Sequence, residues 1–193
     1  IAKAPLVWVF LADTQKWLDA FEETGVYDRT PDIPRRSPGW GDMHLCMQDA
    51  IIAAQTAVIA AEGLGLASCY IGDIIENYEK VSALLNLPRY AVPAAMLVMG
   101  YPTEAASQRA LTPRPPQETQ FMIDDYRHLD AGEREKAFAT HTAPLRERKA
   151  LPFQNTGTYG DLYYVKKYSS SFMDEMNRSA KVFFEKWGDG QDT

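Results

Sequence analysis

A long stretch of helical periodicity constrains the fold of this chain more than any other feature. Between Met43 and Ala61, small and apolar residues recur at intervals of three and four, which is the spacing of one face of an α-helix. The run predicts a helix of roughly 20 residues, about 30 Å long. Many of these residues are alanines, and the apolar positions occupy more than one stripe. We therefore predict a central helix that is buried on several sides.

Short apolar runs before and after this helix predict strands. They are "PLVWVFLAD" (5–13), "ASCYIG" (67–72) and "AVPAAMLVMGY" (91–101), and continuous apolar runs of this length are typical of buried strands. Helical patterns lie between them, and the one that begins at Glu76 ends before Pro88, which cannot continue a helix. Strands that alternate with helices predict a sheet protein of the α/β or α+β class.

The composition changes after Tyr101, where a proline-rich irregular segment begins. Beyond it, residues 131–149 are charged and helical in pattern, and another helical pattern runs from Tyr163 onward. We predict that residues 1–118 form the core. Residues 119–193 are predicted to be a C-terminal extension that packs on this core or on a partner subunit.

Charge and cysteine content argue against several classes of protein. The chain has 193 residues, a net charge of −6 and a pI near 5.1, whereas nucleic-acid binders usually present a basic face. Two cysteines, Cys46 and Cys69, are too few for a disulfide framework and are typical of a reducing compartment. The longest apolar runs are shorter than the roughly 20 residues that span a bilayer. We expect a cytoplasmic protein without a nucleic-acid or membrane partner.

The usual catalytic and metal-binding patterns are missing from the sequence. His44, His128 and His141 are scattered, without partners at metal-ligand spacing. The two cysteines form no CxxC, and no Walker loop or complete GxGxxG is present. Cys69 is a candidate nucleophile, although a buried strand cysteine is the commoner case. We predict no metal site and no catalytic side chain, so an enzymatic role would need a cofactor.

The segment "GLGLASCYIGDIIEN" (63–77) contains three glycines, so that much of its backbone carries no side chain. Glycine permits conformations and close approaches that a Cβ forbids. The segment is therefore either a tight turn or a seat for a ligand.

Together with its neighbours, this segment resembles the FMN-dependent nitroreductase family. Over residues 49–102 a long helix is followed by Gly-Leu-Gly and a strand, then by a helix that ends in Leu-Pro, then by a strand that ends in Gly-Tyr-Pro. The order, spacing and identity of these features all match the family. "AKAPLVWVFLAD" (2–13) resembles its preceding strand, and "ALTPRPP" (110–116) resembles its Arg-Pro segment.

The resemblance implies an α+β fold with a central, mostly antiparallel sheet flanked by helices. It also implies a homodimer with FMN at the subunit interface, formed in part by the long helix. Family members take a hydride from NADH or NADPH onto flavin N5 and reduce a nitroaromatic, quinone, enone or similar small acceptor in a ping-pong cycle.

The resemblance also implies cofactor-binding residues. Four consecutive residues would lie along the flavin ring, with a backbone amide donating to N5: Tyr70, Ile71, Gly72 and Asp73. Arg114 matches the family's phosphate-binding arginine, because a guanidinium forks onto phosphate oxygens, and Arg109 is a second candidate for that role. The alternatives are a plain strand-to-helix turn with Asp73 as the N-cap, and a solvated Arg114.

The chain also departs from the family. The Arg-x-Ser-x-Arg motif that binds the FMN phosphate has no counterpart, and we expect roughly 50 to 60 residues before Ile1, judged by typical domain size. Two alternatives keep the fold and change the role. One is a flavin-free interaction subunit, and the other is a relative that performs reductive dehalogenation or flavin fragmentation.

Overall fold

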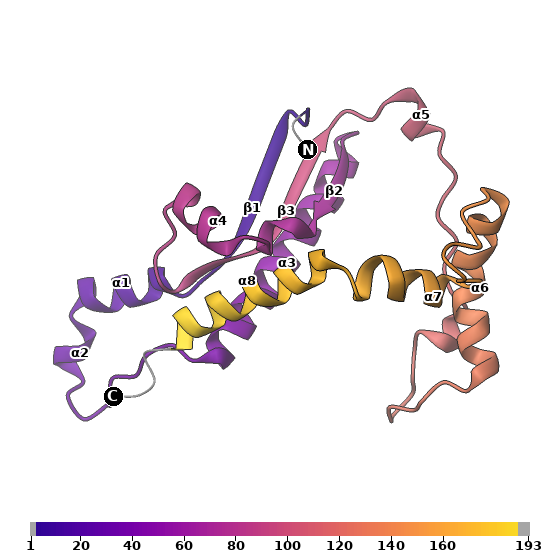
Figure 1. The fold of residues 1–193 in the computed structure, drawn as a ribbon. Coiled ribbons are helices and arrows are strands. Elements are labelled where there is room, and N and C mark those ends of the chain that lie inside the picture. The colour runs from indigo at the N-terminus through magenta and orange to yellow at the C-terminus, as the bar shows by residue number, and fades with distance from the viewer. Residues whose placement is uncertain (1–2, 189–193) are drawn as a thin grey trace. The chain divides into compact units, whose positions relative to one another are not determined.

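The computed structural model describes residues 3–188, which fall into two compact units (Figure 1). The first unit extends to Ser107 and resumes at Glu175, and the second is Gln108–Asp174. The elements in chain order are β1 (Leu6–Asp13), α1 (Gln15–Thr24), α2 (Val26–Arg29), α3 (Trp40–Gly63), β2 (Ala67–Ile71), the 3-10 turn η1 (Gly72–Ile75), α4 (Tyr78–Leu85), β3 (Ala91–Gly100), α5 (Glu104–Ser107), the 3-10 turn η2 (Gln117–Thr119), α6 (Ala131–Glu147), α7 (Tyr159–Tyr163), the π-helical turn η3 (Tyr164–Tyr168) and α8 (Ser171–Gly188).

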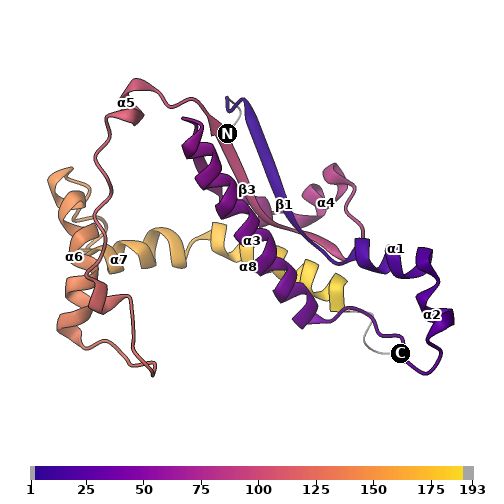
Figure 2. The same cartoon turned by 180° about the vertical axis from the view of Figure 1, so that it is seen from behind.

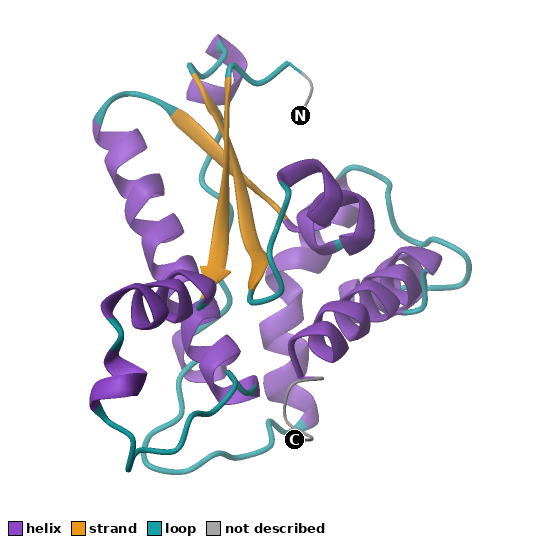
Figure 3. Cartoon of the chain, turned by 90° about the vertical axis from the view of Figure 1, so that its left-hand side faces the viewer, coloured by secondary structure: helices purple, strands orange, loops and turns teal. Residues whose placement is uncertain are grey.

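The first unit is built on a three-stranded sheet with the order β1-β3-β2 (Figure 3). Both strand pairs are antiparallel. Leu6 lies opposite Met99, and Ala67 opposite Gly100, with a register shift between Phe10 and Leu11. The three predicted strands and the antiparallel α+β sheet are therefore confirmed.

Helix α3 packs along one face of this sheet, and Figure 2 shows it beside β3 and β1. Ala54 and Ala61 of the helix form a buried cluster with Ala95, Leu97 and Met99 of β3. The three β3 residues alternate along the strand, so all point to the same face. Alanine side chains let the helix lie close to that face, which explains why the sequence has so many of them.

The prediction that α3 is buried on several sides is wrong for the part of the chain that the structure describes. The sheet covers one side of the helix, while Leu45, Ile52 and Ile59 on other sides are more than 60% exposed. Within residues 3–188, α3 is also the one helix whose length and composition would allow it to cross a membrane. The core helix of a soluble protein can have the same length and composition, and α3 packs against the sheet as such a helix does.

The prediction that the first strand is buried also fails at its start. Leu6, Val7 and Trp8 are exposed, and burial increases toward Ala12. Successive side chains of a strand point to opposite faces, so the exposure of all three residues means that neither face of β1 is fully covered at this end. A continuous apolar run cannot reveal which residues of an edge strand are left uncovered.

A second cluster joins the C-terminal helix to the end of the sheet. Phe183 of α8 packs edge-on against Tyr78, with ring centroids 5.6 Å apart. Trp187 packs in the same way against Tyr90 at 5.5 Å. Val92 of β3 is fully buried in this cluster. The helical spacing predicted for this end of the chain is confirmed, and the first unit includes the helix from Glu175 onward.

The second unit is organised around α6. Asp130 caps its N-terminus by accepting from the amide of Glu133, whose carboxylate accepts in turn from the amide of Asp130. Arg127 forks onto the Glu133 carboxylate at 2.7 and 2.8 Å. This arrangement is a capping box. It fixes the start of the helix at Ala131, directly after the irregular residues 121–130.

Candidate functional site

The glycine pair at the end of α3 forms a helix stop. The amide of Gly65 donates to the Glu62 carbonyl, and the amide of Leu66 donates to the Ala61 carbonyl, each at 2.9 Å. Gly65 has φ +74°, and these bonds with a left-handed residue define a Schellman motif. Residues 63–77 were expected to form either a tight turn or a seat for a ligand, and at Gly65 the chain forms the tight turn.

Strand β2 leads from this turn to the predicted flavin seat. Its ladder is formed with β3, in which Tyr70 lies opposite Leu97, so both side chains face α3. The Tyr70 hydroxyl lies 3.4 Å from Oε1 of Gln55 on that helix, a long hydrogen bond. Tyr70 is still 42% exposed. The Tyr70 side chain is therefore only partly covered and contacts α3 through its hydroxyl.

At Gly72 the backbone is open to solvent. Gly72 is exposed, a Cβ built on it would meet no atom within 4 Å, and its φ lies outside the left-handed region. The glycine is therefore not required by the turn geometry. What its hydrogen side chain provides is free space above the backbone, which fits the close approach of a flat ring.

Asp73 lies inside η1, so the alternative that it caps a helix is wrong. Its carbonyl accepts from the amide of Glu76 at 3.0 Å, and Ile71 occupies the N-cap position. In a 3-10 turn the first amides have no acceptor within the turn. The turn itself therefore supplies no acceptor for the amides of Gly72 and Asp73, and an acceptor atom of a bound group could fill that role.

Side chains from α8 contact the segment that follows this seat. The hydroxyl of Ser179 lies between the amide of Tyr78 and the carbonyl of Ile75, and Glu175 accepts from the amide of Asn77. Nothing in the sequence signals these contacts, because the partners are about a hundred residues apart. Sequence reasoning missed them for that reason.

The two predicted phosphate-binding residues lie in the second unit. Arg109 and Arg114 are exposed and sit in irregular chain between α5 and η2. Arg114 forms no ion pair with any residue in the range 3–188. Tyr70 to Asp73 therefore lie on one continuous segment of the first unit, whereas both arginines belong to the second unit.

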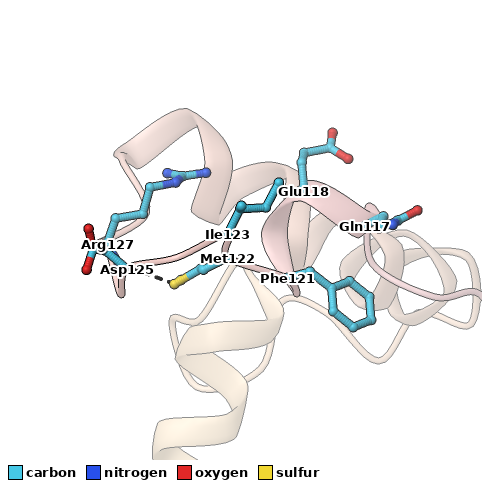
Figure 4. A pocket seen from close by; sticks show the side chains of 7 residues that line it. All are labelled: Gln117, Glu118, Phe121, Met122, Ile123, Asp125 and Arg127. Atoms are coloured by element: carbon cyan, nitrogen blue, oxygen red, sulfur yellow. Dashed lines mark hydrogen bonds between the residues drawn. The ribbon is translucent and has the colours of Figure 1, made fainter.

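The second unit contains a cavity of about 570 Å³, shown in Figure 4. Phe121 and Ile123 give it apolar walls, and Arg127, already paired with Glu133, lies at one side. A cavity of about 340 Å³ in the first unit lies where α3 meets β2 and is lined in part by Val58 and Ser68. Neither cavity is lined by the predicted seat.

Within residues 3–188, no group of three or more histidines, cysteines or acidic residues is placed to hold a metal ion. Cys69 is exposed, so it is not the buried strand cysteine that we considered the commoner case. Its Sγ lies 3.5 Å from the Tyr70 carbonyl.

Comparison with known proteins identifies the class defined by this fold. The Nitroreductase family model matches residues 2–101, a range that contains the whole sheet, α3 and the β2–η1 segment. The chain therefore belongs to the nitroreductase family.

Individual relatives agree with this assignment. The chain is 33% identical over 157 residues to an oxygen-insensitive NADPH nitroreductase of Salmonella typhimurium, covering 81% of this chain and 58% of the relative. It is 33% identical over 130 residues to an FMN reductase [NAD(P)H] of Bacillus subtilis, covering 67% and 49%. The chain thus spans about half the length of the curated relatives it matches.

Solved structures show the same fold. A putative oxidoreductase from Bacteroides fragilis superposes with a TM-score of 0.78 at 22% identity, covering 95% of this chain and 71% of that one. NfrA1 of B. megaterium gives a TM-score of 0.71 at 26% identity, covering 94% and 69%. The nitroreductase-like α+β fold predicted from the sequence is confirmed.

Proposed function

We propose that the protein is an FMN-dependent oxidoreductase that takes electrons from NADH or NADPH. The observation that carries the proposal is the open backbone at Gly72, at the end of an edge strand inside the region that matches the family. The names of the relatives, an NADPH nitroreductase and an FMN reductase, support both the cofactor and the donor.

The residues of the seat have distinct roles in this proposal. Gly72 leaves room for the flavin ring, and an amide of the Gly72–Asp73 turn donates to the ring edge. Tyr70, anchored to Gln55, borders the ring, and Ile71 supplies an apolar wall. When bound, FMN supplies the atom that accepts and delivers hydride. A backbone donor preorganised at that atom stabilises the charge that develops there.

Arg114 is proposed to bind the FMN phosphate, with Arg109 as a second candidate. Exposed guanidinium groups without a carboxylate partner can fork onto phosphate oxygens.

The acceptor is proposed to be a small, flat, electron-poor molecule of the nitroaromatic, quinone or enone type, reduced in a ping-pong cycle. An open site above Gly72 suits a flat acceptor that replaces the nicotinamide after the first half-reaction. The same site would serve donor and acceptor in turn.

We also propose that the protein is a cytoplasmic homodimer formed through α3. The exposed apolar side chains of this helix, such as Leu45, Ile52 and Ile59, form an apolar surface whose exposure to water is unfavourable. Burial against a second copy would remove that surface from water, at roughly 25 cal/mol per Å².

Anaerobic spectroscopy tests the proposal. Purified protein supplied with FMN should show the yellow flavin absorbance, and this absorbance should bleach on addition of NADPH or NADH. Subsequent addition of a quinone or nitroaromatic should restore it. Protein that remains colourless with added FMN would contradict the proposed activity and favour a flavin-free member of the fold.

A further inference from the structure

Helix α4 does not cap its own N-terminus. Its N-cap residue, Asn77, has left-handed backbone angles of φ 52° and ψ 48°, and its side chain makes no capping bond. The first amides of a helix need acceptors from elsewhere. A left-handed non-glycine residue persists only where its surroundings hold it in place.

Two side chains of α8 supply the missing acceptors. Oγ of Ser179 accepts from the amide of Tyr78 at 2.8 Å and donates to the carbonyl of Ile75 at 2.6 Å. Oε1 of Glu175 accepts from the amide of Asn77 at 3.2 Å. Ser179 is fully buried. The C-terminal helix of the same chain thus caps α4 and also hydrogen-bonds to Ile75, the last residue of η1.

Arg178 fixes this cap. Its guanidinium forks onto Glu79 of α4 at 2.7 and 3.0 Å, and it also contacts Glu175 at 2.7 and 2.8 Å. One arginine therefore orients the capping carboxylate and ties it to the helix that it caps. Such fork contacts define geometry more strictly than a point charge does.

We propose that Ser179, Glu175 and Arg178 are positioning residues for the flavin seat. The chain between Gly72 and Asn77 is short, so fixing Ile75 and Asn77 also fixes the direction in which the Gly72 and Asp73 amides point. This inference rests on the proposed function. It adds that a helix about a hundred residues away in sequence preorganises the cofactor site.

Preorganisation predicts a specific defect. Without Ser179 Oγ, the amide of Tyr78 and the carbonyl of Ile75 lose their buried partner. The turn then samples other conformations in the apoprotein, and FMN must order it on binding. Ordering a loop on binding lowers affinity without removing any direct contact. Affinity should fall while the sheet and α3 remain intact.

The experiment compares FMN dissociation constants of the wild type, Ser179→Ala, Arg178→Gln and the control Lys181→Gln. Lys181 also lies on α8 and pairs with Glu185 at 3.5 Å, away from α4. All four are titrated at a temperature at which circular dichroism shows them folded. Ser179→Ala should weaken FMN binding about tenfold, as the loss of a buried hydrogen bond would produce. Arg178→Gln should weaken it less, and Lys181→Gln should leave it unchanged.

Hydrogen exchange of the apoproteins provides the second readout. Amides of residues 72–78 should exchange faster in Ser179→Ala, while those of α3 should keep their protection. Variants that bind FMN as the wild type does would overturn the positioning role and leave the proposed function standing. A wild-type protein that takes up no FMN would overturn both. If Ser179→Ala does not fold, Arg178→Gln decides the outcome against its lysine control.

Discussion

The indole of Trp187 lies edge-on against the ring of Tyr90, and its Nε1 donates to the Gly39 carbonyl at 3.1 Å. Trp187 is fully buried. One side chain near the end of α8 therefore joins the start of β3 to the residue that precedes α3. The described end of α8 belongs to the core of the first unit.

Trp187→Phe should destabilise the protein by about 0.5–1.5 kcal/mol, because the half-buried Gly39 carbonyl loses the indole donor and keeps only the amide of Met43. Trp187→Ala should cost about 3–5 kcal/mol, since it also leaves a cavity. Urea unfolding measures both. Trp17→Phe is the matched control, because Trp17 is more than half exposed, and its change should stay within about 0.5 kcal/mol. Equal effects at both tryptophans would contradict the packing described.

The ion pair between Arg178 and Glu79 predicts a pH dependence. Arg178 holds the pKa of Glu79 at about 2, below its usual 4.5. A carboxylate with a lowered pKa in the folded state stabilises the fold above its unfolded pKa, and this contribution disappears as the pH falls toward 2. The pair is exposed, so the effect is small. Arg178→Gln should flatten the decline of the unfolding free energy between pH 4.5 and 2, and a profile parallel to the wild type would contradict the pairing.

The two glycines of the β2 region should respond differently to alanine. Gly65→Ala places a Cβ at φ +74° and should destabilise the protein by about 1–2 kcal/mol. Gly72→Ala meets no atom of the protein and should leave stability within about 0.5 kcal/mol. Its added methyl should nevertheless weaken FMN binding. A Gly72→Ala variant with wild-type affinity would remove Gly72 from the seat.

The proposed dimer interface is tested on α3. Ile52→Glu should shift the mass measured by light scattering from that of two chains to one chain of 21.7 kDa, because a charge buried in an apolar interface is unfavourable. Leu84→Glu on α4 is the control, since Leu84 is 84% exposed and lies outside the proposed interface. A wild-type protein that is already monomeric would contradict the proposal.

Local pattern predicted the elements of this fold well, because it reports on local structure. The periodicity of 43–61 and the runs at 67–72 and 91–101 correspond to α3, β2 and β3. Burial was predicted less well. Whether Ile52 of α3 or Val7 of β1 is covered depends on which elements lie beside it, and an apolar run does not encode its neighbours.

The candidate site was likewise predicted only where its features are local in the sequence. Gly65 and Gly72 both stand out in the sequence, but only their surroundings separate a left-handed turn from an open backbone. The cap formed by Ser179 has no local signal, because it joins residues about a hundred positions apart. Serine at that position of the helix pattern looks like any other polar residue.

Titration of the apoprotein with FMN, followed by absorbance and flavin fluorescence, is the decisive measurement for the flavin seat. We expect saturable binding of one FMN per chain, with wild-type affinity in Lys181→Gln and weaker binding in Gly72→Ala. Absence of binding by the wild type, or binding that Gly72→Ala leaves unchanged, would contradict the assignment of Tyr70 to Asp73 as the flavin seat.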